Sequence, residues 1–248
     1  MKVAIVTGGS SGIGAATVKE LSRRGWQVVV NYAKNHEAAR KMVSENKNAI
    51  AVQADVSRDE ECRRLAKTVL EKCGGIDALV NNAGTTKAVP HAELDGLSAE
   101  DFQRIYQMNV VAPFQLVRAC AAALKERRGA VVNVSSVAAV LGTGSSIAYA
   151  ASKAALNTMT FSLARVLAPE VRVNVVCPGH TNTPWHVAAR GAAGAAEVEK
   201  RYASIAPLKS ASEPEDVADA IVWLIEGARR VTGEVVFVDG GMHVAAPR

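Results

Sequence analysis

Short apolar runs that alternate with helical patterns are the feature that most constrains how this chain of 248 residues can fold. The runs have the length of buried strands, and the segments between them show the apolar spacing of helices. The predicted strands are residues 2–7, 27–31, 49–53, 77–80, 129–135, 171–177 and 235–238. The predicted helices end at Arg24 or span residues 35–46, 58–73, 98–126, 147–168 and 213–226. This alternation predicts an α/β fold, in which a doubly wound parallel sheet of about seven strands carries helices on both faces.

The length of the chain bears on the number of domains. A chain of 248 residues can bury one sizeable core, and α/β folds of this size are often single domains. We therefore expect one domain over residues 1–248. Within it, residues 184–206 are rich in alanine and glycine, whose small side chains pack weakly. We expect this segment to be a substrate flap, mobile without ligand, with Trp185, His186 and Tyr202 as its substrate contacts.

The sequence shows no pattern of export, membrane insertion or metal binding. Its first residues run straight into a strand pattern, and its apolar runs are shorter than the roughly 18 residues of a membrane span. The four cysteines form no C-x-x-C pair, and the five histidines form no H-E-x-x-H motif. We therefore expect a cytoplasmic protein with reduced thiols, no membrane contact and no catalytic metal.

The net charge of +5 raises the question of nucleic-acid binding. The arginine pairs Arg23-Arg24, Arg127-Arg128 and Arg229-Arg230 each close a helical pattern, where cations complement the helix dipole. Cations at helix ends are scattered over the surface and do not form one basic stripe. We therefore expect no nucleic-acid partner.

A glycine-rich turn follows the first predicted strand and leads into a helix. It contains Gly8, Gly12 and Gly14 in the spacing G-x-x-x-G-x-G. Glycine permits tight backbone geometry, and the N–H groups of a helix N-terminus can bind a pyrophosphate. The spacing differs from the common G-x-G-x-x-G fingerprint, but its place between strand and helix indicates a nucleotide site.

A tyrosine and a lysine four residues apart, Tyr149 and Lys153, stand in a predicted helix. The spacing puts both side chains on one helix face, about 6 Å apart along the axis. A neighbouring cation lowers the pKa of a phenol from its usual value near ~10, so Tyr149 is expected to exchange a proton with a carbonyl or an alcohol. Ser136 ends the fifth apolar run, at the sheet edge where ligands bind. Alone, such a pair more often only decorates a helix surface.

Further motifs occur in order along nearly the whole chain. They are Thr7-Gly8-Gly9-Ser10-Ser11-Gly12-Ile13-Gly14, Asp55, Asn81-Asn82-Ala83-Gly84, Asn109, Ser136, Tyr149 with Lys153, Pro178-Gly179 with Thr183, and Asp239-Gly240-Gly241. Together they resemble the short, one-domain branch of the short-chain dehydrogenase/reductases, and most closely its 3-oxoacyl-carrier-protein reductases. The resemblance implies an NAD(P)-binding domain of the Rossmann type that reversibly reduces a ketone or aldehyde to an alcohol by hydride transfer.

The resemblance also implies roles for single residues. Tyr149 would be the general acid/base, and Ser136 would hold the substrate carbonyl. Lys153 would bind the nicotinamide ribose and lower the tyrosine pKa, and Asn109 would support a water that relays protons. The implied cofactor contacts are Gly8, Ser10, Ser11, Gly12, Ile13, Gly14, Asn31, Lys34, Asp55, Val56, Asn82, Ala83, Gly84, Tyr149, Lys153, Pro178, Gly179, Thr181 and Thr183. Thr183 could also cap the helix that starts at Pro184.

The end of the second predicted strand bears on the choice of cofactor. An acid there would bind the ribose 2′-OH of NAD and repel the 2′-phosphate of NADP. This chain has Asn31, which is neutral and can donate, and Lys34, whose cation can reach a phosphate. The pattern favours NADP(H) over NAD(H). Ser11 is a departure, since many NADP-dependent relatives have a basic residue there, and Lys34 could be an ordinary solvated lysine.

Assembly and substrate are constrained less. The helix near residues 149–168 is apolar nearly all round, so more than one face needs cover, and the resemblance suggests a homotetramer. We expect a small carbonyl or alcohol substrate, with an acyl thioester among the candidates. Two alternatives stay open: an NAD-dependent alcohol or polyol dehydrogenase, and a nucleotide-binding redox sensor without useful turnover.

Overall fold

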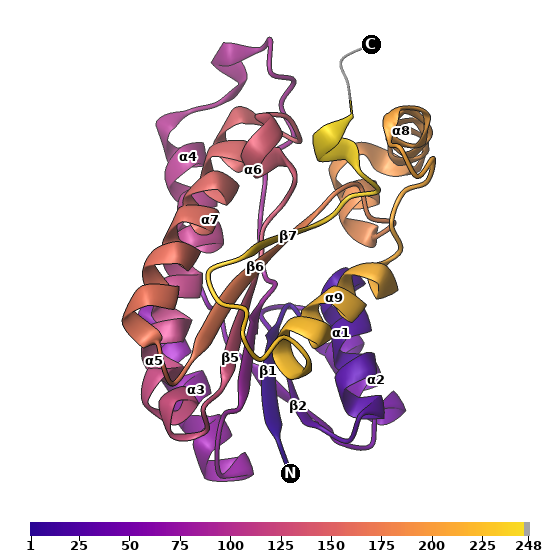
Figure 1. Ribbon diagram of the computed structural model, residues 1–248. Coiled ribbons are helices and arrows are strands. Elements are labelled where there is room, and N and C mark those ends of the chain that lie inside the picture. Colours follow the sequence, from indigo (N-terminus) through magenta and orange to yellow (C-terminus); the bar gives the residue numbers. More distant parts are fainter. Residues whose placement is uncertain (246–248) are drawn as a thin grey trace.

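The computed structural model describes residues 1–245, with the side chains at positions 189 and 190 left out. Over this part of the chain, seven parallel strands form one sheet in the order β3-β2-β1-β4-β5-β6-β7 (Figure 1). The strands are β1 (Val3–Thr7), β2 (Gln27–Tyr32), β3 (Ala49–Gln53), β4 (Ala78–Asn81), β5 (Ala130–Val134), β6 (Arg172–Pro178) and β7 (Val235–Val238). The predicted doubly wound α/β fold is confirmed. The predicted single domain extends over 246–248, which lie outside the described residues, and it stays a prediction.

Helices cover both faces of the sheet (Figure 1). One face carries α1 (Gly12–Arg23), α2 (His36–Glu45) and α9 (Pro214–Glu226). The other carries α3 (Asp59–Cys73), α4 (Ala99–Tyr106), α5 (Ala112–Glu126) and α7 (Ile147–Leu167). Two helices, α6 (Ala138–Leu141) and α8 (Pro184–Ile205), lie beyond the carboxyl ends of the strands, at the top of the view. Short 3₁₀ turns cover Leu94–Gly96 and Met242–Val244.

The strands are buried on both faces, which explains why they read as continuous apolar runs. Successive side chains of a strand point to opposite faces. In β1, Ile5 packs into the core under α3, α5 and α7, whereas Val6 packs into the core under α1, α2 and α9. The order of the strands reverses between β1 and β4, and the edge outside this reversal is where open α/β sheets bind ligands.

Two predicted segments differ in detail from the structure. The helix expected over residues 98–126 is divided into α4 and α5 by a π-helical turn, Gln107–Val111. Pro113 has no N–H to donate to the carbonyl of Asn109, four residues earlier, which fits a widened turn at this place. The expected flap is helical: α8 covers most of it and is interrupted at Gly191, whose φ of 72° and ψ of 168° are non-helical.

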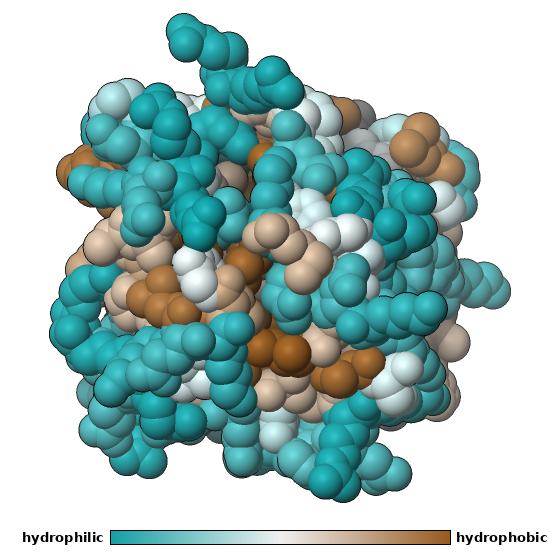
Figure 2. Space-filling model, turned by 90° about the horizontal axis from the view of Figure 1, so that it is seen from below, coloured by the Kyte–Doolittle hydropathy of each residue, from teal (hydrophilic) through white to brown (hydrophobic). Residues whose placement is uncertain are grey.

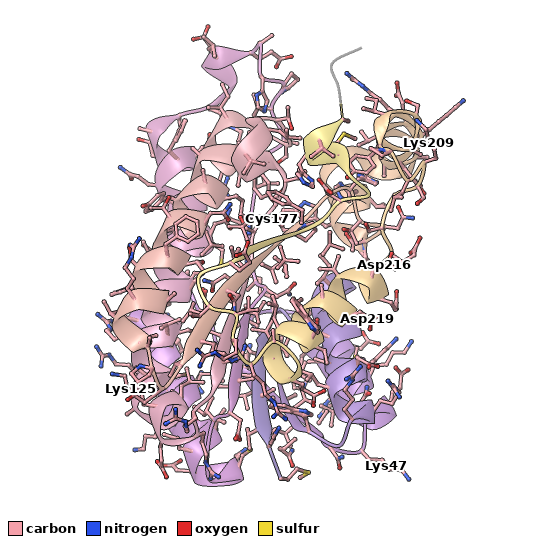
Figure 3. The ribbon with its side chains drawn as sticks, in the orientation of Figure 1. Lys47, Lys125, Cys177, Lys209, Asp216 and Asp219 are labelled. Carbon is pink, nitrogen blue, oxygen red and sulfur yellow. The ribbon has the colours of Figure 1, made fainter. Side chains whose placement is uncertain are left out.

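Seen from below, at the amino ends of the strands, the surface is mostly hydrophilic around a central group of apolar residues (Figure 2). Lys47, Lys125 and Lys209 point outward at three separate places, whereas Cys177 lies inside the molecule on β6 (Figure 3). Among the described helices, none has the length and apolar character needed to cross a membrane.

Candidate active site

A cavity of about 710 Å³ opens at the carboxyl ends of the strands. Its volume lies within the range of roughly 300–1,000 Å³ that is usual for small-molecule sites. At one end the cavity reaches Asn31, near the end of β2, and Asp55, which follows β3. Tyr149 on α7 and several side chains of α8 line its other end. The cavity therefore spans the edge of the sheet across the reversal point.

The turn after β1 and the loop after β4 are tied together by Thr7 and Asn82. The Thr7 hydroxyl accepts the N–H groups of Asn82 and Ala83, each at 2.9 Å. The Asn82 side-chain amide donates to Thr7 O at 2.8 Å and to Gly8 O at 3.3 Å. These bonds hold the glycine turn against β4, so both loops form one wall of the cavity.

Gly14 allows α1 to approach this turn closely. A Cβ atom at position 14 would lie 2.4 Å from Gly8 O and 2.6 Å from Asn82 Nδ2, which is closer than side chains come. Any larger residue would push the helix away from the turn. Gly14 is not among the described wall residues, but it lets the N-terminus of α1 pack directly against the turn that forms the wall.

The N-terminus of α1 and the residues after β3 fit a dinucleotide. Gly12 and Ile13, the first two residues of α1, line the middle of the cavity, and first-turn N–H groups have no partner within a helix. Such N–H groups bind phosphates. At the end of the cavity, Asp55 Oδ1 accepts from Ser57 N at 3.0 Å and Ser57 Oγ at 2.7 Å, which fixes a carboxylate where a nucleoside would lie.

Asn31 offers this end an acceptor. It is buried, and its amide nitrogen donates to Ala54 O at 3.0 Å and to Val52 O at 3.4 Å. Backbone carbonyls thus use the amide hydrogens, and Oδ1 is left for a ligand. The expectation that Asn31 donates to a ligand is therefore wrong. The argument for NADP depends instead on the missing acid and on Lys34, which is exposed.

Tyr149 and Lys153 stand near the start of α7, where Ser146 caps the helix by accepting the Tyr149 N–H at 3.3 Å. Lys153 Nζ donates to Val134 O, at the end of β5, at 2.8 Å. The same nitrogen lies 5.7 Å from the centroid of the Tyr149 ring. Ser136 follows β5 and lines the same cavity. The structure thus brings the three predicted side chains to one wall.

Burial shifts both titratable groups toward their neutral forms. Burial raises the pKa of Tyr149 to about 12, and a hydrogen bond with the Ser136 side chain acts against this increase. Burial lowers the pKa of Lys153 to about 8. The predicted decrease of the Tyr149 pKa is not seen in the chain by itself, because the loss of solvation outweighs the other contributions to this pKa. Tyr149 is protonated at neutral pH and can donate a proton.

Asn109 connects the loop after β4 with α7. It lies fully buried in the π-helical turn, a structure that often occurs at functional sites. Its amide donates to Thr85 O at 3.0 Å and to Ser152 Oγ at 2.9 Å, and its Oδ1 accepts from Thr85 N at 2.8 Å. Ser152 Oγ in turn donates to Tyr149 O at 2.7 Å. Asn109 therefore supports the turn of α7 that carries Tyr149.

Helix α8 closes the other end of the cavity with flat side chains. The Trp185 ring lies 6.4 Å from the Tyr149 ring, and the His186 ring lies 4.1 Å from that of His180, measured between centroids. Tyr202 lines the cavity with its ring, while its hydroxyl donates to Asp239 O at 2.6 Å. The three flap residues expected to touch substrate therefore all line the cavity.

Comparisons with known proteins identify the family. A family model described as enoyl-(acyl carrier protein) reductase matches residues 8–243. A protein named as ketoacyl reductase 2 of the granaticin polyketide synthase of Streptomyces violaceoruber is 41% identical over 243 residues, which cover 98% of this chain and 96% of that protein. The chain belongs to the short-chain dehydrogenase/reductase family.

Two further relatives support this membership. The 3-oxoacyl-[acyl-carrier-protein] reductase of Synechocystis sp. is 36% identical over 249 residues, which cover 97% of this chain and 96% of the relative. A crystal structure of a short-chain dehydrogenase/reductase from Burkholderia xenovorans matches with a TM-score of 0.91 at 37% identity and covers 99% of both chains. The resemblance seen in the sequence is confirmed: the protein is an oxidoreductase that acts on CH–OH groups with NAD(P) as acceptor.

Most residues that the family resemblance singled out line the cavity. They are Gly8, Ser11, Gly12, Ile13, Asn31, Asp55, Val56, Asn82, Ala83, Gly84, Ser136, Tyr149, Lys153, Pro178, Gly179, Thr181 and Thr183. Ser10, Gly14, Lys34 and Asn109 are not among the described residues of the wall. Arg201 and Met242 line it without having been predicted. Positions 198, 201, 202 and 205 have the spacing of one helix face, a signal that could have identified Arg201.

Proposed function

We propose that this short-chain dehydrogenase/reductase reduces a ketone or aldehyde to an alcohol with NADPH, in a reversible reaction with Tyr149 as general acid/base. The observation that carries the proposal is the half-buried, protonated Tyr149 beside Ser136 and Lys153, on the wall of a cavity that the N-terminus of α1 also lines. These groups supply a proton donor, a hydrogen-bond donor and a cation at one place.

The side chains divide the work on the substrate oxygen. The bound nicotinamide cofactor supplies the hydride that the carbonyl carbon accepts. Ser136 Oγ donates a hydrogen bond to the carbonyl oxygen, and Tyr149 Oη transfers its proton to the same oxygen as negative charge develops there. The products are the alcohol and a Tyr149 phenolate, which the Lys153 ammonium stabilises until it is reprotonated. Oxidation of an alcohol reverses these steps.

The cofactor would lie along the cavity. The N–H groups of Gly12 and Ile13 would hold the pyrophosphate, Asp55 the adenine, and Lys153 the nicotinamide ribose. Thr183 and the Pro178-Gly179 turn, which line the end near Tyr149, would hold the nicotinamide. The preference for NADPH is supported by the neutral Asn31 at the end of β2 and by the nearby cation of Lys34.

We also propose a homotetramer in the cytoplasm. The support is the apolar surface on helices that the sheet covers on one side only. Val166 on α7 is 67% exposed, and Phe102 and Tyr106 on α4 and Phe114 on α5 are more than 40% exposed. Burying such side chains against a second copy is favourable. The four cysteines are free thiols, as in proteins of a reducing compartment.

Consumption of NADPH tests the proposed function. The purified protein is incubated with NADPH and, in parallel, with a diketone, an aldehyde and a short 3-oxoacyl thioester. We expect loss of NADPH absorbance with at least one of them and a matching amount of alcohol product. Binding of NADPH without turnover of any carbonyl would contradict the proposed activity and favour a sensor.

A further inference from the structure

Charge is distributed unevenly along the cavity wall. Among the lining side chains that the structure describes, Asp55 is the only carboxylate, and it follows β3 at one edge of the sheet. Helix α8 follows β6, near the other edge, and contributes Arg201. Within the described residues, no carboxylate pairs with the Arg201 guanidinium. Among the described side chains that line the α8 end of the cavity, Arg201 is thus a cation without a carboxylate beside it on the wall.

A row of rings leads from the proton donor to this guanidinium. Trp185 lies 6.4 Å from Tyr149 and is followed in the chain by His186. The His180 ring lies 4.1 Å from His186 and 5.9 Å from Tyr202. Arg201 precedes Tyr202 and lines the same cavity. A substrate whose carbonyl lies at Tyr149 can thus extend along these flat side chains toward Arg201.

The turn of α8 that carries Arg201 is attached to the sheet. The Tyr202 hydroxyl donates to Asp239 O, just after β7, at 2.6 Å. It fits there because residue 179 is glycine: a Cβ at this position would lie 1.8 Å from Tyr202 Oη. Two residues before Arg201 on α8, the Glu199 carboxylate oxygen Oε1 accepts a hydrogen bond from the Asn182 side-chain amide at 3.0 Å. The backbone at Arg201 therefore has a defined position relative to the strand ends, whereas Trp185 lies before the interruption at Gly191.

We propose that Arg201 binds an anionic group at the far end of the substrate, so that the enzyme prefers carbonyl compounds with a carboxylate or phosphate away from the reacting carbon. The proposal rests on the proposed function of the Tyr149 site. A guanidinium binds either anion through paired N–H donors, and the planar fork makes this geometry specific. An anion held by Arg201, away from the reacting carbon, would orient the carbonyl group of the substrate toward Tyr149.

Matched ketones test this subsite. The experiment compares kcat/KM with NADPH for 9-oxodecanoate and its methyl ester, which differ in charge and are long enough to extend along the row of rings, for the wild type, Arg201→Gln and Lys200→Gln. Lys200 is the control, because it is exposed on the same helix and is not among the described wall residues. We expect the wild type to favour the acid by about 10- to 100-fold. Arg201→Gln should lower kcat/KM for the acid far more than for the ester and so remove this preference, and Lys200→Gln should keep it.

Each outcome bears on one of the two proposals. Reduction of the ester without any preference for the acid, or an equal effect of both substitutions, would overturn the anion subsite while the proposed function stands. If neither ketone is reduced, calorimetric titration of 9-oxodecanoate into the NADPH-bound protein decides: affinity that depends on Arg201 supports the subsite, and equal affinity in Arg201→Gln rejects it. A phosphopantetheine thioester of the same acyl chain shows whether a phosphate can replace the carboxylate.

Discussion

The ammonium nitrogen of Lys153 lies 5.7 Å from the centroid of the Tyr149 ring and donates its hydrogen bond to Val134 O, at the end of β5. The Lys153 ammonium is therefore close to the Tyr149 ring but makes its hydrogen bond to the backbone of β5. Lys153 is buried and Tyr149 is half-buried, and the loss of solvation disfavours the ammonium and the phenolate alike. The proposed reaction needs the Lys153 ammonium to be present when the Tyr149 phenolate forms.

Removal of the phenolic hydroxyl tests the proposed acid. Tyr149→Phe keeps the ring and loses the proton, so kcat should fall by roughly 10²–10⁴-fold. The affinity for NADPH, measured by fluorescence titration, should stay within about twofold of the wild type. Lys153→Ala should lower both kcat and cofactor affinity, since it also removes the ribose contact. A nearly normal kcat in Tyr149→Phe would show that another group supplies the proton.

The pH dependence of reduction reports on Lys153. Its pKa is lowered to about 8, so the ammonium is present below this pH and lost above it. Tyr149 stays protonated over the same range, because its pKa is raised to about 12. We expect kcat for reduction to be level below pH 8 and to fall as pH rises above it. A rate that increases between pH 8 and 9.5 would contradict a role for the lysine cation.

Lys153 also links stability to pH. Its pKa falls from 10.5 in the unfolded chain to about 8 in the folded protein, so between these values the unfolded chain holds a proton that the folded protein has lost. The contribution of this group to the free energy of unfolding therefore rises with pH in this window. Denaturant unfolding at pH 7 and pH 9.5 should show a larger stability gain for the wild type than for Lys153→Met. Equal gains would indicate an unshifted lysine.

The proposed role of Lys34 in the preference for NADPH can be tested by kinetics with both cofactors. On the native enzyme, kcat/KM should be higher with NADPH than with NADH. Lys34→Gln should lower kcat/KM for NADPH by about 3- to 10-fold and leave NADH unchanged, because only NADPH has a 2′-phosphate. Lys41→Gln is the control, since Lys41 is an exposed lysine on α2.

Asn31→Asp addresses the same question from β2. The carboxylate should shift the preference toward NAD, by like-charge repulsion on the order of 1–3 kcal/mol. It would also face Ala54 O, which the Asn31 amide now donates to at 3.0 Å, so some loss of stability is expected. A clear preference of the native enzyme for NADH would reject the NADP assignment, whatever the variants do.

The Tyr202 hydroxyl should matter for substrate binding. Tyr202→Phe keeps the ring on the cavity wall and loses the bond to Asp239 O, so the second half of α8 becomes less well placed. We expect KM for the carbonyl substrate to rise several-fold with a smaller change in kcat, and stability to fall by about 0.5–1.5 kcal/mol. Tyr106→Phe, on α4 and not among the described wall residues, is the matched control for substrate binding and should leave KM unchanged. An unchanged KM in Tyr202→Phe would mean that the bond does not position α8.

The hydrogen bonds of Glu199 and Tyr202 limit which part of the predicted flap, residues 184–206, is expected to move. Residues 192–205 are held by the bonds of Glu199 and Tyr202, so mobility without ligand is expected chiefly before Gly191. Hydrogen exchange should be fast at residues 184–188 in the free protein and slower with NADPH and substrate. Uniform protection of the whole segment in the free protein would contradict a flap.

Assembly can be tested at an exposed apolar position. Val166→Lys puts a charge on the exposed face of α7, so it should dissociate the proposed tetramer at micromolar concentration. Leu94→Lys, at an equally exposed site in a 3₁₀ turn, should leave the assembly intact. Light scattering measures both. A stable wild-type monomer would reject the assembly outright.

The sequence by itself determined the fold and many of the residues that face the cavity. Strands buried on both faces must be apolar throughout, so residues 2–7 and 129–135 could be recognised without knowledge of their neighbours. Tyr149 and Lys153 share a helix face because of their spacing alone. The family motifs then assigned further positions, many of which lie in the loops that follow the strands, at the carboxyl edge of the sheet.

Only the tertiary structure decided the chemical state of these groups. The pKa directions of Tyr149 and Lys153 depend on burial by other elements, which a spacing of four residues does not contain. The amide of Asn31 is turned toward Ala54, 23 residues away, and Tyr202 reaches Asp239 over 37 residues. Arg201 likewise reaches the cavity only because α8 folds back over the strand ends. Hydrogen bonding and desolvation act through space, so they follow from which segments meet and not from the order of residues along the chain.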